Sequence, residues 1–379
     1  MISSYTFVVE SVSELKAELA KALVSVKFEP VLAFGFVSVN MPITKFMDVF
    51  ESYDILLFGV TGGGEILFDK QQDKLISNGA VFVLTDLKPD VFKRYFINRN
   101  GINNYTFGKL IGEKIKASFQ NPSVILATSG LSLDGQAMLD GVLDVAGSNI
   151  SLYGGMAADD GMFSKTFVFT EANISDDGAL ALVFDGSAIE LRGLSTSGWM
   201  SLGSEFVVNH SEGNVVYEIN GQPALDMYID YLNVTEEDLP GIGLEYPFML
   251  KQGEDEIVIR AVMQVDTEKR ALIFAGSVPQ GSVISFSSSP GFEIMENTRN
   301  KIIDFHTLYP EADLMLLFSC VARHVALGPL ISTEIKLASI KWKVPLLGFF
   351  SFGEFGSNEG RSCQLNNQTF TLALIRDKT

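Results

Sequence analysis

The sequence predicts an α/β protein of mixed α+β character, with two related lobes of mixed sheets, antiparallel hairpin-rich segments and flanking helices. Three observations lead to this prediction. Apolar strand-like runs alternate with amphipathic helix-like stretches over the first 160 residues. From about residue 165, short strands are separated by turns such as Asp177-Gly178, which is typical of antiparallel hairpins. A similar order of elements returns in the second half, which indicates an internal duplication.

The first half supplies most of the expected helices. Ser11 and Glu14 have the spacing of a capping box, so a helix is expected over residues 11–24. Further helices are expected over Pro42–Tyr53, Asn103–Gln120 and Ser132–Leu143. Strands are expected over Val31–Val37, Asp54–Gly59, Ala80–Leu84, Ser123–Ala127 and Ser151–Tyr153.

Short strands dominate the middle of the chain, and the alternation then resumes. The hairpin-rich strands are expected at Thr166–Thr170, Ala179–Phe184, Ala188–Ser195, Phe206–Asn209 and Val215–Ile219. Later strands are expected at Ile257–Val262, Ala271–Ala275, Val283–Ser287, Leu314–Phe318, Leu346–Phe350 and Phe370–Ile375, with helices at Gln222–Tyr231, Gly291–Thr307 and Pro329–Lys341. A boundary near residues 220–240 divides the chain into two predicted domains, 1–220 and 221–379.

A glycine-acid pattern occurs twice, each time after an apolar strand. Gly59 and Gly64-Glu65 in the first copy match Gly348 and Gly353-Glu354 in the second. The segments 123–160 and 313–360 also share one order: strand, small-residue turn with serine, helix, strand and a glycine-rich acidic loop. Ligands of α/β proteins commonly bind at strand ends, so each copy predicts a strand-end crevice.

Composition excludes several classes of partner. The net charge is -18 at pH 7, whereas binding to nucleic acid or anionic lipid needs clustered Lys and Arg. No apolar run reaches the ~20 residues that span a bilayer, and no signal peptide is evident. Two cysteines, Cys320 and Cys363, make a disulfide framework unexpected, which fits a cytoplasmic protein.

The order of four motifs resembles the FIST family. They are Thr61-Gly-Gly-Gly-Glu65, Tyr153-Gly-Gly-Met-Ala-Ala-Asp159, Phe318-Ser-Cys-Val-Ala-Arg323 and Leu347-Gly-Phe-Phe-Ser-Phe-Gly-Glu354. The resemblance covers roughly residues 30–375 and includes both the N-terminal and the C-terminal FIST parts. It implies a bacterial sensory module for small ligands such as amino acids. It also implies a signalling partner, such as a histidine kinase of a two-component system or a cyclic-di-nucleotide enzyme. The stand-alone subgroup that it is similar to senses nitric oxide through haem.

The candidate ligand-binding residues lie in these motifs. Glu65 and Glu354 are suited to bind a ligand amine or an arginine, and Arg323 to clamp a carboxylate or a haem propionate. The structural alternatives are a tight turn with a capping or solvated acid, and an ion pair of Arg323, for instance with Glu354. The predicted set is Arg323, Glu354, Cys320, Gly353, Ser351, Glu65, Gly64 and Asp159.

For two further candidates, Cys320 and the Asp159/Asp160 pair, a structural role is the simpler expectation. Cys320 fits an inert buried thiol better than a reactive one. Asp159 and Asp160 could do acid–base work or hold a hard cation, but a turn with backbone hydrogen bonds is the simpler expectation. The resemblance suggests that Asp159 shapes the N-terminal site.

A haem group would need an axial ligand, and three histidines are available. His324, next to Arg323, is the first choice. His306 lies near a helix end, where it could favour the helix dipole, and His210 at a hairpin turn. The sequence lacks Cys-x-x-Cys-His, which excludes covalent haem attachment.

These residues predict a non-catalytic sensor. An enzyme, such as a hydrolase or transferase using Glu354, Cys320 or the Asp159/Asp160 pair, is the alternative. It would need a nucleophile–base pair or a metal cluster, and the sequence shows neither. A scaffolding protein is the third possibility and would lack an enclosed pocket.

Overall fold

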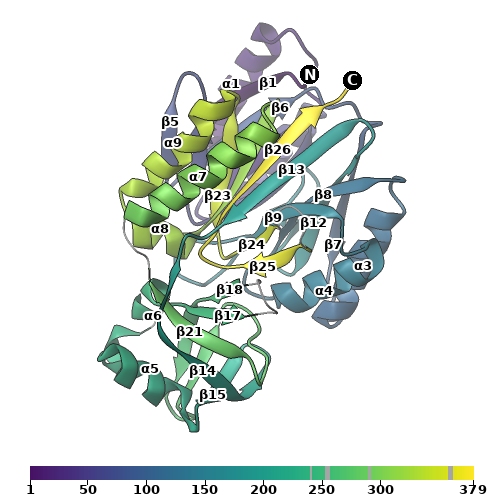
Figure 1. The fold of residues 1–379 in the computed structure, drawn as a ribbon. Helices are drawn as coiled ribbons and strands as arrows, with labels where there is room; N and C mark the ends of the chain where they lie inside the picture. Colours follow the sequence, from purple (N-terminus) through teal and green to yellow (C-terminus); the bar gives the residue numbers. More distant parts are fainter. Residues whose placement is uncertain (240, 252–256, 289–291, 357–361) are drawn as a thin grey trace.

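The computed structural model describes residues 1–239, 241–251, 257–288, 292–356 and 362–379. It consists of a large lobe, which carries both termini, and a smaller lobe below it (Figure 1). The predicted α/β class and the two-lobe arrangement are confirmed. The predicted division at residues 220/221 falls inside the small lobe, after β15 (Val215–Ile219), and stays a prediction about the sequence.

The large lobe contains three copies of one unit, where the sequence had indicated two. In each copy, two parallel strands flank a helical crossover and an antiparallel strand lies beside the first of them. Unit 1 has β2 (Leu32–Ser38), α2 (Ile43–Ser52), β3 (Leu56–Gly62) and β6 (Ala80–Thr85). Unit 2 has β8 (Pro122–Thr128), α4 (Gly135–Ala146), β9 (Ser151–Met156) and β12 (Gly178–Asp185). Unit 3 has β22 (Leu314–Cys320), α8 (Val321–Leu327), α9 (Leu330–Trp342), β23 (Leu346–Ser351) and β26 (Phe370–Asp377).

Each unit begins with an edge strand and a helix that precede its first parallel strand. The edge strands are β1 (Ser4–Val9), β7 (Phe92–Asn98) and β13 (Ile189–Thr196). The helices are α1 (Val12–Ser25), α3 (Asn104–Lys116) and α7 (Phe292–Leu308). Ser11 caps α1 as predicted, because its hydroxyl accepts the Glu14 N–H. The helix predicted over Gly291–Thr307 is α7, and Gly291 itself lies outside the described residues.

The units exchange hairpins in a cycle. Unit 1 sends β4 (Glu65–Phe68) and β5 (Asp73–Ile76) to the sheet of unit 3. Unit 2 sends β10 (Val168–Phe169) and β11 (Ile174–Ser175) to unit 1, and unit 3 sends β24 (Gly353–Gly356) and β25 (Gln364–Asn366) to unit 2. Among the described residues this gives three six-stranded sheets of equivalent strand order. Their inner faces share one apolar core, in which Phe36, Phe318 and Phe349 meet.

The exchange corrects one prediction. Glu65 and Glu354 were expected on strand-end loops, but each lies within a strand. Pairing fixes their equivalence, because Ile66 faces Gly348 and Phe355 faces Gly154, and these two glycines match Gly59. The third equivalent position is held by Val168, which precedes the Phe169 that faces Gly59. The acid is therefore present in two of three copies.

The small lobe is inserted into unit 3, between β13 and α7. Its strands are β14 (Met200–Glu212), β15, β16 (Gln222–Pro223), β17 (Phe248–Lys251), β18 (Ile257–Arg260), β19 (Val262–Asp266), β20 (Ala271–Phe274) and β21 (Val283–Ser288). Its helical elements are α5 (Ala224–Leu232), the 3-10 turn η1 (Glu236–Asp238) and α6 (Gly241–Glu245). It has its own apolar core, and Met249 and Ile259 also pack against the large lobe. The chain enters the small lobe from β13 through residues 197–199 and is again part of the large lobe at α7.

Candidate functional site

Glu354 is a fully buried acid whose carboxylate is held by hydroxyl groups. The Ser351 hydroxyl donates to Oε1 at 2.6 Å, and the Thr369 hydroxyl donates to Oε2 at 2.8 Å. The Thr369 backbone N–H also donates to Oε2, at 3.3 Å. Burial nevertheless raises the pKa of Glu354 to about 8, because desolvation penalises its charged form more than these bonds stabilise it. The group can therefore change protonation near neutral pH.

Thr369 connects this acid to a pocket between the lobes. Its hydroxyl lies 3.3 Å from that of Thr371, which lies 2.9 Å from that of Ser195. Thr369 and Ser195 both line a cavity of about 380 Å³, within the usual size range of ligand pockets. The described residues that line it are Ser195, Thr196, Ser197, Gly198, Ile257, Asn297, Asn300, Lys301, Asp304, Gly356, Ser362, Gln364, Asn366 and Thr369.

The lining of this interlobe pocket is mostly neutral and polar. Hydroxyl and amide groups dominate it, and Ile257 is the contribution of the small lobe. Lys301 and Asp304 add one charge of each sign, three residues apart on α7, and so share a face of that helix. Both are exposed, and neither belongs to an ion pair among the described residues. The described part of the lining thus offers many hydrogen-bonding groups and one charge of each sign to a small polar ligand.

Arg323 forms an internal ion pair, which was the structural alternative to clamping a ligand carboxylate. It is fully buried and paired with Glu334 of α9, not with Glu354. Its Nε donates to Glu334 at 2.9 Å, and the remaining four N–H groups reach Glu334, Ser197, Gln368 and Thr298. A guanidinium has five donors, and all five are used here. No donor is left in this structure for a ligand carboxylate.

The other residues predicted around Glu354 contact neighbouring parts of the protein itself. Cys320 is buried, and burial raises the pKa of its thiol to about 12, so it is an inert thiol at neutral pH. Gly353 pairs with Met156, and a Cβ there would lie 2.8 Å from a Leu365 methyl carbon. Ser351 contributes directly, through its bond to Glu354.

Glu65 occupies the equivalent position in unit 1 without any of these partners. It is fully buried, and neither carboxylate oxygen has a hydrogen-bond partner among the described residues. Strand registers explain the difference: the equivalent of Ser351 is Gly62, and the equivalent of Thr369 is Gly79. Burial, and then the nearby Asp160, raise the pKa of Glu65 well above its usual value. Gly64 precedes it with a φ of +122°, a conformation that favours glycine.

Asp159 organises the loop that follows β9. It is fully buried, and its carboxylate accepts the backbone N–H groups of Phe163, Ser164 and Lys165. This matches the simpler expectation of a hydrogen-bonded turn. Asp160 is exposed and accepts from the Asn40 amide at 2.5 Å. Among the described residues, no three His, Cys, Asp or Glu side chains are grouped to hold a metal ion.

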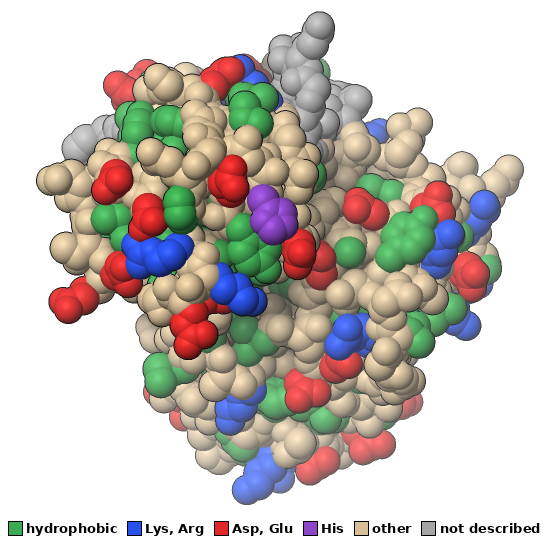
Figure 2. Space-filling model, turned by 90° about the horizontal axis from the view of Figure 1, so that it is seen from below, with side chains coloured by type: hydrophobic (Ala, Val, Ile, Leu, Met, Phe, Trp, Pro, Cys, Tyr) green, Lys and Arg blue, Asp and Glu red, His purple; other side chains and the backbone are tan. Residues whose placement is uncertain are grey.

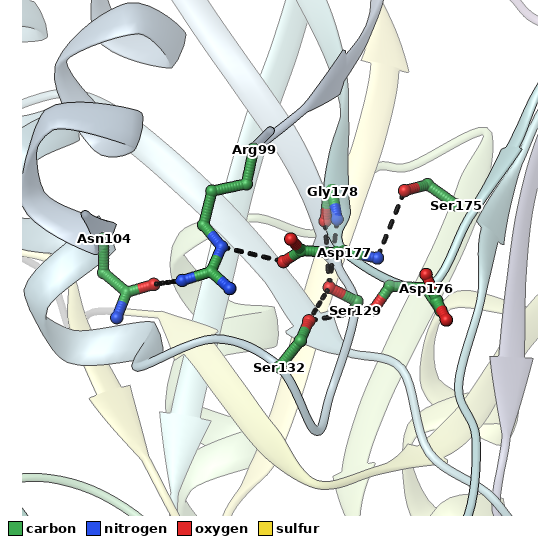
Figure 3. A network of polar contacts seen from close by, with 8 residues as sticks. All are labelled: Arg99, Asn104, Ser129, Ser132, Ser175, Asp176, Asp177 and Gly178. Carbon is green, nitrogen blue, oxygen red and sulfur yellow. Dashed lines mark hydrogen bonds and ion pairs between the residues drawn. The ribbon is translucent and has the colours of Figure 1, made fainter. Parts of the chain in front are cut away.

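The third copy of the site is filled by internal contacts (Figure 3). Ser129, the equivalent of Cys320, lies 3.0 Å from the Ser132 hydroxyl and accepts the Gly178 N–H at 3.1 Å. The Ser132 hydroxyl donates to the Asp176 carbonyl, so the loop after β8 is tied to the turn before β12. At this position unit 2 has Val168 in place of the acid, and Ser129 and Ser132 are engaged in internal hydrogen bonds.

The three histidines lie apart from one another, and none lines the interlobe pocket. His324 is half-buried and stacks on Phe350, with ring centroids 4.0 Å apart, and burial lowers its pKa. His306 packs edge-on against Trp342. His210 was expected at a turn but lies within β14, exposed and stacked on Tyr217.

Sequence reasoning missed the pocket residues on α7 and Thr369. The run Asn366-Asn-Gln-Thr369, four polar residues directly before an apolar strand, was the available signal. Lys301 and Asp304 gave none, because charged pairs are common on helices. Seen from the small-lobe side, acidic and basic side chains are interspersed on the surface (Figure 2). Within the described chain, every helix is too short or too polar to cross a bilayer.

Comparison with known proteins identifies the family. The model of the FIST N domain matches residues 31–222, and that of the FIST C domain matches residues 224–357. The chain belongs to the FIST family. FIST domains are generally small-ligand sensor domains. The two matches meet inside the small lobe, so the family division and the structural lobes do not coincide.

The relatives themselves are described as uncharacterized. The chain is 22% identical over 239 residues to "Uncharacterized protein Mb0898c" of Mycobacterium bovis and to "Uncharacterized protein MT0897" of Mycobacterium tuberculosis. Each match spans 60% of this chain and 61% of the relative. A crystal structure of cyanuric acid hydrolase from A. caulinodans aligns over the whole of both chains, but with a TM-score of 0.34 and 9% identity. A likeness this weak carries no argument about fold or activity.

Proposed function

We propose that this FIST protein is a non-catalytic, cytoplasmic sensor whose ligand binds in the interlobe pocket. The carrying observation is the pocket of about 380 Å³ with the buried Glu354–Thr369 pair behind it. A small amino acid-like ligand suits its lining. Lys301 would attract the ligand carboxylate, Asp304 the ammonium group, and the hydroxyl and amide groups its remaining polar atoms.

A thermal-shift screen with the individual amino acids tests this proposal. We expect at least one to raise the melting temperature of the wild type, because a ligand that binds only the folded state stabilises it. Lys301→Ala and Asp304→Ala should lose that shift and keep the ligand-free melting temperature. Lys88→Ala, an exposed lysine that does not line the pocket, is the matched control. If both pocket variants keep the full shift, the ligand binds elsewhere.

Signalling would follow from a change in conformational populations. A ligand shifts such an equilibrium only by its differential affinity for the two states. The family suggests a histidine kinase or a cyclic-di-nucleotide enzyme as the partner that reads the shift. The interlobe position supports this idea, because a ligand there contacts both lobes.

The geometry gives less support to a sensor that binds nitric oxide through haem. His324 is engaged with Phe350, and the interlobe pocket offers no histidine, cysteine, methionine or tyrosine among its described residues. These residues do not fit a haem site, and we derive no step through haem. An absorption spectrum of protein from a haem-supplemented culture, with and without nitric oxide, tests the point. A stoichiometric Soret band that is lost in His324→Ala would support haem binding through His324.

An enzymatic alternative would use the same acids. Glu354 is placed to exchange a proton near neutral pH, but it faces Ser351 and Thr369, and the thiol of Cys320 is protonated. Because Glu354 does not itself line the pocket, a ligand there meets Thr369 first. The sensor interpretation is therefore preferred.

A further inference from the structure

Arg323 is placed where the two lobes join. The segment 197–199 leads from β13 into the small lobe, and α7 begins directly after the chain returns. The Arg323 guanidinium donates to the Ser197 carbonyl in the first connection and to the Thr298 hydroxyl on α7, at 3.0 Å. Its Cζ also lies 5.5 Å from the centre of the Trp199 ring. One side chain thus contacts the first connection and the helix that follows the second.

The same side chain supports two walls of the interlobe pocket. Ser197 lines the pocket directly, and Arg323 donates to its carbonyl. On the other side, Arg323 donates at 3.0 Å to the carbonyl of Gln368. Gln368 precedes Thr369, which lines the pocket and binds Glu354. Arg323 therefore ties these two walls together just beyond Thr196 and Phe370, the last pair of the β13–β26 ladder.

The counterion of Arg323 fixes the orientation of the guanidinium, and it comes from the next helix, α9. Glu334 of α9 binds two of its nitrogens, and both side chains are fully buried. A planar, bidentate pair fixes the orientation of the guanidinium as well as its position. The three remaining N–H groups are thereby aimed at Ser197, Gln368 and Thr298. A lysine has one nitrogen and cannot reach all of these acceptors at once.

We propose that Arg323 is the positioning residue of the interlobe pocket and the pivot between the lobes. This proposal rests on the proposed function, in which the interlobe pocket is the ligand site. Arg323 holds the walls at Ser197 and Gln368 at a fixed separation while Glu334 anchors it to the large lobe. A ligand that moves the Gln368 wall acts on the connection to the small lobe through Arg323, whereas Ser197 is itself part of that connection. Ligand occupancy would in this way change the orientation of the small lobe.

Hydrogen–deuterium exchange without any ligand tests the pivot. In Arg323→Lys we expect backbone exchange to rise at least threefold in peptides that cover residues 197–200 and 367–370, with little change in unit 1. The matched control is Arg94→Lys, which alters another ion pair of low exposure, that of Arg94 with Glu171 at the unit 1–unit 2 contact. It should raise exchange near Leu57 and Glu171 and leave residues 197–200 as in the wild type.

Two outcomes overturn the proposal: unchanged exchange at residues 197–200 in a folded Arg323→Lys protein, or a uniform rise over the whole chain. If Arg323→Lys does not fold, Thr298→Val serves instead, because it removes one acceptor and no charge. It should raise exchange in peptides at the start of α7 and at residues 197–200, and no change there counts against the pivot. Because these measurements use no ligand, a failed amino acid screen with a positive exchange result would discard the ligand site and keep the pivot.

Discussion

Glu354 and Glu65 occupy the same position in two copies of one unit, yet their surroundings are opposite. Glu354 receives two hydroxyl groups and a backbone N–H, whereas Glu65 is equally buried and receives no hydrogen bond from the part of the chain that the structure describes. Two residue pairs make the difference, Ser351 against Gly62 and Thr369 against Gly79. The comparison teaches that a repeated acid does not imply a repeated site. The donors around it decide what it does.

The largest expected effect is a fall in stability as pH rises. The folded-state pKa of Glu354 is raised to about 8 from its ordinary 4.5, so the folded protein holds this proton more tightly than the unfolded chain. Its stability contribution is complete below about pH 4.5 and is lost as pH rises to about 8, on the order of 5 kcal/mol in all. Urea unfolding at several pH values measures this loss, and Glu354→Gln should remove much of it. An identical pH profile in Glu354→Gln would show that this acid titrates normally.

Removing the partnered acid should destabilise the protein. Glu354→Leu removes the carboxyl acceptor of the Ser351 and Thr369 hydroxyls and leaves them only their longer contacts with the Ser319 carbonyl and the Thr371 hydroxyl. The loss should cost about 2 kcal/mol. Chemical denaturation at pH 6 measures the change. Glu354→Gln, which keeps an acceptor, should cost clearly less. Equal losses in the two variants would mean that packing, and not hydrogen bonding, holds this side chain.

Removing the unpartnered acid should have the opposite sign. Glu65→Met replaces a buried carboxyl without partners by an apolar side chain of similar length, and should stabilise the protein by about 1–2 kcal/mol. The same denaturation experiment measures it. A destabilised Glu65→Met protein would show that Glu65 has a partner that this structure does not contain, such as a bound cation or water. In that case the unit 1 crevice would become a site worth examining.

The smallest effect should come from making Glu354 resemble Glu65. Ser351→Ala removes one of its donors and should cost about 1 kcal/mol. Because fewer hydrogen bonds then stabilise the charged form, the pKa of Glu354 should rise further. Carbon-13 NMR titration of the Glu354 carboxyl measures this shift. An unchanged pKa would show that Thr369 alone sets the charge state.

Local sequence patterns were enough to predict much of this protein. Strand and helix periodicity predicted the α/β class and most elements of all three units, and the glycine–acid repeat located Glu65 and Glu354. The capping pair at Ser11 and Glu14 predicted the start of α1. These features depend on residues close together in the chain. For that reason they can be read without a structure.

Contacts between distant segments decided the rest. The threefold character of the repeat was missed because the glycine–acid pattern links units 1 and 3 only, since Val168 stands in place of the acid in unit 2. The hairpin exchange places β4 beside β23 although nearly the whole large lobe separates them in sequence. The partner of Arg323 is Glu334 on the next helix, and the partner of Glu354 is Thr369, beyond the end of β25. The pocket draws its walls from both lobes and from α7. Tertiary structure alone determines such sites, because hydrogen bonds and burial depend on distance in space and not on distance along the chain.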